Sequence, residues 1–151
     1  MSNTREHEPK RAVILLVEDS PADQVTIERS LEDGRVQCEL FVVENGEQAL
    51  AWLHYDDPIT HPKPDLILMD INMPVMDGIT ALKKIRADSH LKTIPVIMLT
   101  TSDTGRDVDL SYTEGANAFI TKPVSEIAFV EAVVKLEQFW FELVTLPNTG
   151  P

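Results

Sequence analysis

Five short apolar segments recur along the chain, and helix-like segments separate them. Each apolar segment is four to seven residues long, and most are rich in Val, Ile and Leu, as expected for strands that are buried on both faces. Strands that alternate with helices predict a parallel sheet covered by helices on both sides. We therefore predict an α/β fold with a doubly wound, five-stranded parallel sheet. The expected strands are residues 12–17, 39–44, 65–70, 94–100 and 118–121.

Between these segments the sequence carries the start and stop signals of helices. Ser20 and Pro21 suit the N-cap and the first position of a helix that ends before Gly34. Asn45 is followed three residues later by Gln48, which is the spacing of a capping box. The remaining helices are expected at residues 45–55, 77–88 and 105–115, followed by a long last helix from residue 125.

The chain of 151 residues is long enough for one domain with a single core. We expect residues 1–10 to be a disordered tail, 11–146 to be one domain with an extended C-terminal helix, and 147–151 to be a short tail, with no output domain. No apolar stretch has the length of a membrane span, and the N-terminus has no signal-peptide pattern. The single cysteine, Cys38, fits a reducing compartment, so we expect a cytoplasmic protein.

The net charge of −12 bears on possible partners. Proteins that bind nucleic acid neutralise phosphates with clustered Lys and Arg, which an acidic chain of this kind does not favour. For most of the surface the charge indicates solubility. We therefore expect neither nucleic acid nor a membrane as a partner.

Polar residues stand where the predicted strands end. They are Glu18 and Asp19, Asp70, Thr100 and Lys122. Because parallel strands end at the same edge of a sheet, where ligands bind, these side chains are expected to converge. Three carboxylates would repel one another, by about 4 kcal/mol for a pair about 4 Å apart. A divalent cation removes that repulsion, and oxygen ligands suit Mg²⁺, which often bridges to a phosphate. An aspartate can itself be the nucleophile in phosphoryl transfer, assisted by Mg²⁺ and lysine.

The sequence resembles the receiver domains of two-component response regulators. The stretches "LLVEDS", "LILMDINMPVMDG", "IMLTTS" and "FITKP" occur in that family's order, and the resemblance covers roughly residues 12–140. It implies the flavodoxin-like receiver fold and a phosphoryl group that passes from a sensor histidine kinase to Asp70. It also implies a protein that catalyses only its own phosphorylation and dephosphorylation and is not otherwise an enzyme.

The resemblance also implies a role for each residue near Asp70. Asp19 would bind Mg²⁺ directly together with Asp70, and Glu18 would act mainly through water. Asn72 would offer its backbone carbonyl to the metal.

The switch residues follow from the same resemblance. Thr100 would donate a hydrogen bond to the phosphoryl group, and Lys122 would be the phosphate-binding lysine, joined to Pro123 by a bond that is typically cis in the family. Phe119 stands at the aromatic switch position, where many relatives have Tyr. Because Phe has no hydroxyl, its switching would depend on ring packing alone.

A narrower likeness concerns the small stand-alone regulators that are paired with phytochrome histidine kinases. It rests on the proline-rich loop before the third strand, on "LTTSD", "SY" and "EGANAFITKPV", and on a last helix with "FW" and a trailing "LP". Beyond Leu136 this helix has apolar residues on almost every side, which either extend the core or pair with another protomer. We favour a homodimer whose interface contains Phe139, Trp140, Phe141 and Val144.

Two alternatives remain. A degenerate receiver could bind a kinase or another partner without phosphorylation, although the complete acidic cluster and Lys122 argue against it. A flavodoxin-like cofactor binder would need a phosphate-binding loop after the first strand, where "VEDSPAD" would repel a phosphate.

Overall fold

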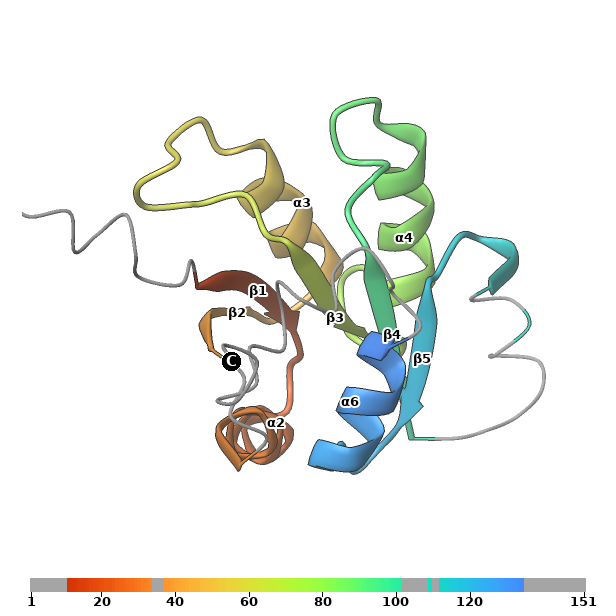
Figure 1. The fold of residues 1–151 in the computed structure, drawn as a ribbon. Coiled ribbons are helices and arrows are strands. Elements are labelled where there is room, and N and C mark those ends of the chain that lie inside the picture. The colour runs from red at the N-terminus through yellow and green to blue at the C-terminus, as the bar shows by residue number, and fades with distance from the viewer. Residues whose placement is uncertain (1–10, 34–36, 102–108, 110–111, 135–151) are drawn as a thin grey trace, which may run out of the picture.

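A computed structural model of the protein describes residues 11–33, 37–101, 109 and 112–134 (Figure 1). These residues form one parallel sheet of five strands in the order β2-β1-β3-β4-β5. The predicted α/β fold with a doubly wound sheet is thereby confirmed. The strands are β1 (Ala12–Val17), β2 (Cys38–Val43), β3 (Leu66–Asp70), β4 (Val96–Thr100) and β5 (Ala118–Thr121).

Helices cover both faces of the sheet. The described helices are α2 (Pro21–Asp33), α3 (Gly46–His54), α4 (Gly78–Ala87) and α6 (Glu126–Val134). Figure 1 shows α2 and α6 on one face, with α3 and α4 on the other.

Two apolar layers result, because successive side chains of a strand point to opposite faces. Ile14 and Leu16 of β1 pack on the side of α2 and α6, whereas Leu15 and Val17 pack on the side of α3 and α4. All four of these side chains are fully buried, so β1 lies at the centre of the core.

The helix start signals read from the sequence are present in the structure. Ser20 Oγ accepts a hydrogen bond from the backbone N–H of Asp23, and Asn45 Oδ1 accepts one from that of Gln48. The Gln48 side chain accepts from the backbone N–H of Glu44 at 2.8 Å, one residue before the position that a regular capping box uses.

Some strand boundaries differ from the predicted ones. β4 begins at Val96, two residues later than predicted, because Pro95 has no N–H to donate to the ladder and the N–H of Ile94 is used in a turn that closes on Leu91. β2 begins and ends one residue earlier than predicted, and β3 begins at Leu66 because the Asp65 carboxylate accepts from the backbone of β1.

The predicted helix at 105–115 is described only in part. Tyr112 and Thr113 are helical, and Gly115 follows with a φ of 104°, a conformation that suits glycine at a helix end. The continuation of the last helix beyond Val134 lies outside the described residues, and so do the predicted interface residues Phe139, Trp140, Phe141 and Val144.

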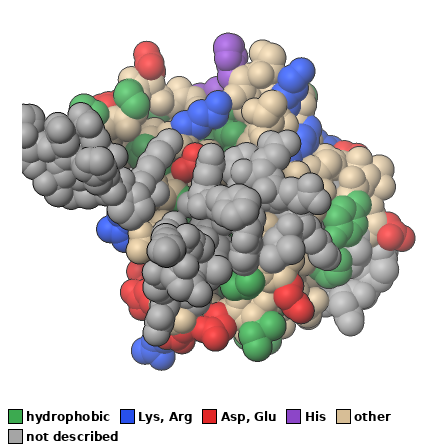
Figure 2. All heavy atoms as spheres, in the orientation of Figure 1, with side chains coloured by type: hydrophobic (Ala, Val, Ile, Leu, Met, Phe, Trp, Pro, Cys, Tyr) green, Lys and Arg blue, Asp and Glu red, His purple; other side chains and the backbone are tan. Residues whose placement is uncertain are grey.

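Acidic side chains gather on the face shown in Figure 2, at the lower left, where α2 lies in Figure 1. Glu28, Glu32 and Asp33 of α2 are exposed and contribute to the negative charge of the chain. Within the described residues, no helix combines the length and the apolar character that crossing a bilayer requires.

Candidate functional site

The strand register brings the predicted site residues to one edge of the sheet. Val17, the last residue of β1, pairs with Met69, so Glu18 follows β1 beside Asp70 at the end of β3. Thr100 at the end of β4 pairs with Thr121 of β5, the residue before Lys122. The convergence expected from parallel strand ends is therefore present, at the position where the chain order reverses between β1 and β3.

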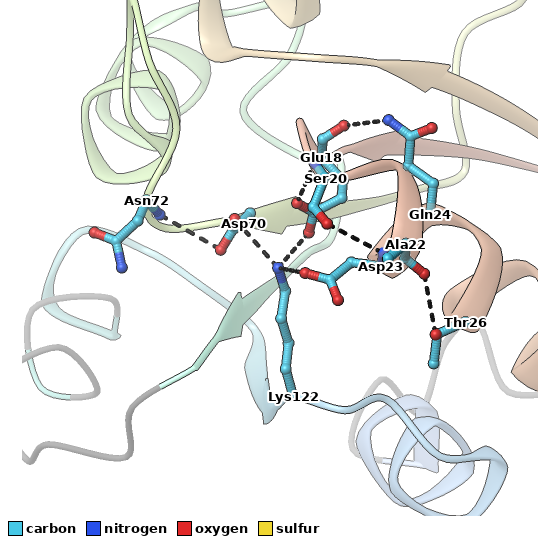
Figure 3. Close-up of polar contacts among 9 residues, drawn as sticks. All are labelled: Glu18, Ser20, Ala22, Asp23, Gln24, Thr26, Asp70, Asn72 and Lys122. Carbon is cyan, nitrogen blue, oxygen red and sulfur yellow. Dashed lines mark hydrogen bonds and ion pairs between the residues drawn. The ribbon is translucent and has the colours of Figure 1, made fainter.

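Lys122 lies at the centre of this group (Figure 3). Its Nζ atom is 2.5 Å from Glu18 Oε1, 2.9 Å from Asp23 Oδ2 and 3.3 Å from Asp70 Oδ2. The side chain of Lys122 is 7% exposed, and that of Glu18 is fully buried. A buried ammonium with several carboxylate partners is held in place, because leaving it unpaired would be costly.

Three carboxylates form a compact group beside this lysine. Glu18, Asp19 and Asp70 each offer an oxygen atom, and these atoms lie within 4.8 Å of one another. Asp70 is 5% exposed, while Asp19 faces solvent. Three hard oxygen donors at this spacing, one of them open to water, fit a divalent cation such as Mg²⁺ that keeps part of its hydration shell.

Burial changes the acidity of two of these groups. Removal from water raises the pKa of the Glu18 carboxyl, although Lys122 and the Ser20 N–H act in the opposite direction. Removal from water likewise raises the pKa of Asp70, against the effect of Lys122. Burial alone would lower the pKa of Lys122, but its contacts with Glu18, Asp23 and Asp70 raise it overall. The carboxylates of Glu18, Asp19, Asp23 and Asp70 outnumber the one ammonium group that they surround, which favours the binding of a cation.

Glu18 is fixed by its neighbours. Its Oε2 atom accepts a hydrogen bond from the backbone N–H of Ser20 at 3.0 Å, and its backbone carbonyl accepts one from Gln24 Nε2 at 2.6 Å. Its Oε1 atom is buried and, among the described residues, has the ion pair with Lys122 but no hydrogen bond of regular geometry. This oxygen retains capacity to accept a hydrogen bond from water around a bound metal.

The loop after β3 holds Asp70 from the other side. The backbone N–H of Asn72 lies 3.4 Å from Asp70 Oδ1, and the exposed Asn72 side chain points away from Lys122 (Figure 3). The backbone N–H of Gly78 donates to Ile71, and a Cβ atom on Gly78 would lie only 2.1 Å from the Asp70 carbonyl oxygen. Glycine is therefore required for the close approach of α4 to the end of β3.

The two predicted switch residues lie on neighbouring strands. Thr100 is fully buried at the end of β4. Phe119 on β5 is half-buried against the core, and its ring meets that of Tyr112 edge to face, with a centroid distance of 5.9 Å. The bond between Lys122 and Pro123 is cis, as the resemblance implied.

Asp23 is a site residue that sequence reasoning missed. It lies in the first turn of α2 and accepts a hydrogen bond from Lys122 Nζ across a sequence separation of 99 residues. The available signal was its position just after the Ser20 N-cap and the Glu18–Asp19 pair, because the start of that helix must lie beside the strand end that precedes it.

Comparisons with known proteins agree with this geometry. The family model described as the response regulator receiver domain matches residues 14–134. The response regulator Rcp1 of Synechocystis sp. is 40% identical over 136 residues, which cover 89% of this chain and 92% of Rcp1. The structure of Rcp1 in its Mn²⁺-bound form has a TM-score of 0.70 at 39% identity and covers 90% of this chain and 99% of that one.

Two further solved structures are similar over nearly the whole chain. The bacteriophytochrome response regulator RtBRR has a TM-score of 0.78 at 35% identity, covering 94% of this chain and 85% of that one. The phosphorylated cyanobacterial phytochrome response regulator RcpA has a TM-score of 0.72 at 36% identity, covering 92% of this chain and all of that one. With the family model matched across the sheet and its strand-end carboxylates, the chain belongs to the response regulator receiver domain family.

Proposed function

We propose that the protein is a response regulator that accepts a phosphoryl group on Asp70 from a sensor histidine kinase, in phytochrome light signalling. The observation that carries the proposal is the position of Asp70: a 5% exposed carboxylate next to two further carboxylates and 3.3 Å from a buried lysine. The phytochrome link is supported by the similarity to RtBRR and RcpA, whose names connect those proteins to phytochromes.

In the transfer, an Asp70 carboxylate oxygen attacks phosphorus. The bond between phosphorus and the donor's histidine nitrogen breaks, and the imidazole keeps the electron pair of that bond. Lys122 offsets negative charge on the transferred group. Mg²⁺, held by Asp19, Asp70 and the backbone carbonyl of Asn72, with Glu18 acting through water, would supply further positive charge.

The switch would follow from two residues that flank the site. The Thr100 hydroxyl, at the end of β4, would turn to donate a hydrogen bond to the phosphoryl group. The Phe119 ring contacts the ring of Tyr112 before phosphorylation, at a centroid distance of 5.9 Å. Phe119 would then repack, and this contact would change. A local change of charge would thereby alter the surface beside β5. We propose that the signal passes on by protein contact, including homodimerisation through the last helix.

Intact mass after incubation with acetyl phosphate and Mg²⁺ tests the proposal. The native chain should gain one phosphoryl group, the gain should disappear with a chelator, and Asp70→Asn should show none. Asp56→Asn is the matched control, because Asp56 is exposed in the loop between α3 and β3 and should be phosphorylated like the native chain. Failure of the native chain to react, with acetyl phosphate and with a phosphorylated phytochrome kinase, would favour the phosphorylation-independent module. Reaction of Asp70→Asn would mean that another residue is the acceptor.

A further inference from the structure

Among the described residues, the ammonium group of Lys122 has one hydrogen bond of regular geometry, to Asp23, and two further ion-pair contacts. It carries three N–H donors. Among the described residues, three carboxylates lie within ion-pair distance of it, one each from Glu18, Asp23 and Asp70. A phosphoryl group on Asp70 adds oxygen atoms that also require a donor. Lys122 has to shift toward these oxygen atoms, and the shift would loosen one of its present contacts.

The three partners differ in how easily they can be released. Glu18 is fully buried, so its carboxylate would be left without water and without its cation. Asp70 carries the phosphoryl group itself and stays beside the lysine. Asp23 has a side chain that is 38% exposed, so water can replace the ammonium at low cost. Asp23 is the partner that Lys122 can exchange.

The contact with Asp23 also helps to orient the lysine, from the side opposite Asp70. It is a regular hydrogen bond of 2.9 Å, whereas the longer contact with Asp70, at 3.3 Å, is an ion pair. Figure 3 shows the ammonium between the start of α2 and the end of β3, with Asp23 on the first side and Asp70 on the other. A charge-assisted hydrogen bond on one side holds the ammonium toward α2 and away from the position of an incoming phosphoryl oxygen.

We propose that Asp23 is a positioning residue that holds Lys122 in the resting protein and releases it to the phosphoryl group on Asp70. The inference rests on the proposed function, and it assigns regulation of the same site to a residue of α2. The bonds that form and break in the transfer are unchanged. What changes is the acceptor of one Lys122 N–H, from the Asp23 carboxylate to a phosphoryl oxygen, while water hydrates Asp23.

The variant Asp23→Asn tests this. It keeps an oxygen that can accept from Lys122 but removes the charge. Phosphorylation by acetyl phosphate with Mg²⁺ should become about fivefold faster, as expected when a charge-assisted hydrogen bond becomes a neutral one. Asp23→Glu, which restores the carboxylate, should return the rate toward that of the native chain. Glu28→Gln removes the same charge from an exposed position of α2 and should leave the rate unchanged.

Two further measurements separate positioning from a structural or long-range effect. The Lys122 ammonium signals in a nitrogen-15 NMR spectrum should exchange faster with water in Asp23→Asn than in the native chain, without any phosphodonor. Beryllofluoride, which mimics the phosphoryl group, should bind Asp23→Asn with Mg²⁺ about fivefold more tightly. Both the rate increase and the tighter binding should persist at high salt, because a contact in a buried site is screened less than long-range attraction.

The outcomes are distinct. A rate and a beryllofluoride affinity that are unchanged or lower in Asp23→Asn would overturn the inference while leaving Asp70 as the acceptor. An increase that Glu28→Gln reproduces, or that vanishes at high salt, would also overturn it, since net charge would then explain the result. If the native chain itself takes up no phosphoryl group, the proposed function fails, and the inference fails with it.

Discussion

Replacing Asp70 by Asn should stabilise the protein when no divalent cation is present. The oxygen atoms of Glu18, Asp19 and Asp70 lie within 4.8 Å of one another. At an effective dielectric constant of about 20, each like-charge pair at that distance costs about 3.5 kcal/mol. Asp70 takes part in two such pairs, and Asp70→Asn relieves both.

The same change removes an attraction. At 3.3 Å, the ion pair of Asp70 with Lys122 contributes about 5 kcal/mol on the same scale, and it is lost in Asp70→Asn. Asp19 faces solvent, so water screens its share, and the two relieved repulsions roughly balance this loss. Burial then decides the sign, because a neutral amide is easier to bury than a carboxylate at a 5% exposed position. We therefore expect a gain of about 1 kcal/mol in the free energy of unfolding.

Urea denaturation in EDTA measures this gain, with Asp56→Asn as a control that leaves the cluster intact. The pH dependence provides a second check. The pKa of Asp70 and that of Glu18 are raised in the folded state, so the folded protein binds more protons than the unfolded chain between the ordinary and the raised values. Stability of the native chain should therefore fall as the pH rises through that window, and Asp70→Asn should fall less.

Added Mg²⁺ should make the native chain the more stable of the two. The ion stabilises the native chain by binding its folded state, and it binds the Asp70→Asn variant less tightly because one of its ligands is missing there. The reasoning would be refuted if Asp70→Asn in EDTA were no more stable than the native chain. In that case the attraction to Lys122 would outweigh both repulsion and burial, and the acidic cluster would not be a source of instability.

Three further predictions concern the surroundings of the site and the opposite end of the sheet. Gly78→Ala should destabilise the protein by about 3 kcal/mol or more in urea denaturation, because the added Cβ would lie 2.1 Å from the Asp70 carbonyl oxygen, a backbone atom that cannot easily move. An alanine variant as stable as the native chain would contradict this close approach. Val75→Gly should stabilise by up to about 1 kcal/mol in the same assay, since a β-branched residue is strained at a φ of 69° and the side chain is 74% exposed; a loss of stability would contradict the strain. The hydrogen bond of His54 Nε2 with Asp88 at 2.8 Å raises the pKa of His54. An NMR titration should therefore place this pKa above about 6.5, and Asp88→Asn should lower it. The stabilisation of the fold by this hydrogen bond is present at low pH and is lost as the pH rises through the raised pKa.

The architecture was predictable because apolar segments and helix signals alternate along the chain. Because the strands are parallel, their carboxyl ends lie at the same edge of the sheet. This places Glu18, Asp70 and Lys122 close together without knowledge of any side-chain contact. The boundaries were less predictable, because they depend on single hydrogen bonds. At the start of β4, apolar character alone extended the strand across Pro95, which has no N–H to donate.

The sequence places Asp23 near the end of the first strand but does not predict its contact with Lys122. The two residues are 99 positions apart, and their approach depends on the direction in which α2 leaves the end of β1. The positive φ of Val75 is a similar case, since a β-branched residue gives no local signal for that conformation. In both cases tertiary packing, and not local preference, determines the geometry.

Asp70 and Asp23 both contact Lys122, yet their replacement by Asn should have opposite effects on stability. Asp70 belongs to the group of crowded carboxylates, whereas Asp23 is outside that group and partly exposed. Asp23 shares Lys122 with Glu18 and Asp70, but water screens its repulsion from them. Asp23→Asn therefore mainly weakens one charge-assisted hydrogen bond, so it should destabilise the protein by about 1 kcal/mol or less in urea with EDTA. Stabilisation by both variants would mean that total negative charge, and not the spacing of individual carboxylates, governs the site. Destabilisation by both would mean that contacts with Lys122 dominate. Opposite signs would show that the lysine has one partner that contributes to the strain of the resting site and another that only holds it in place.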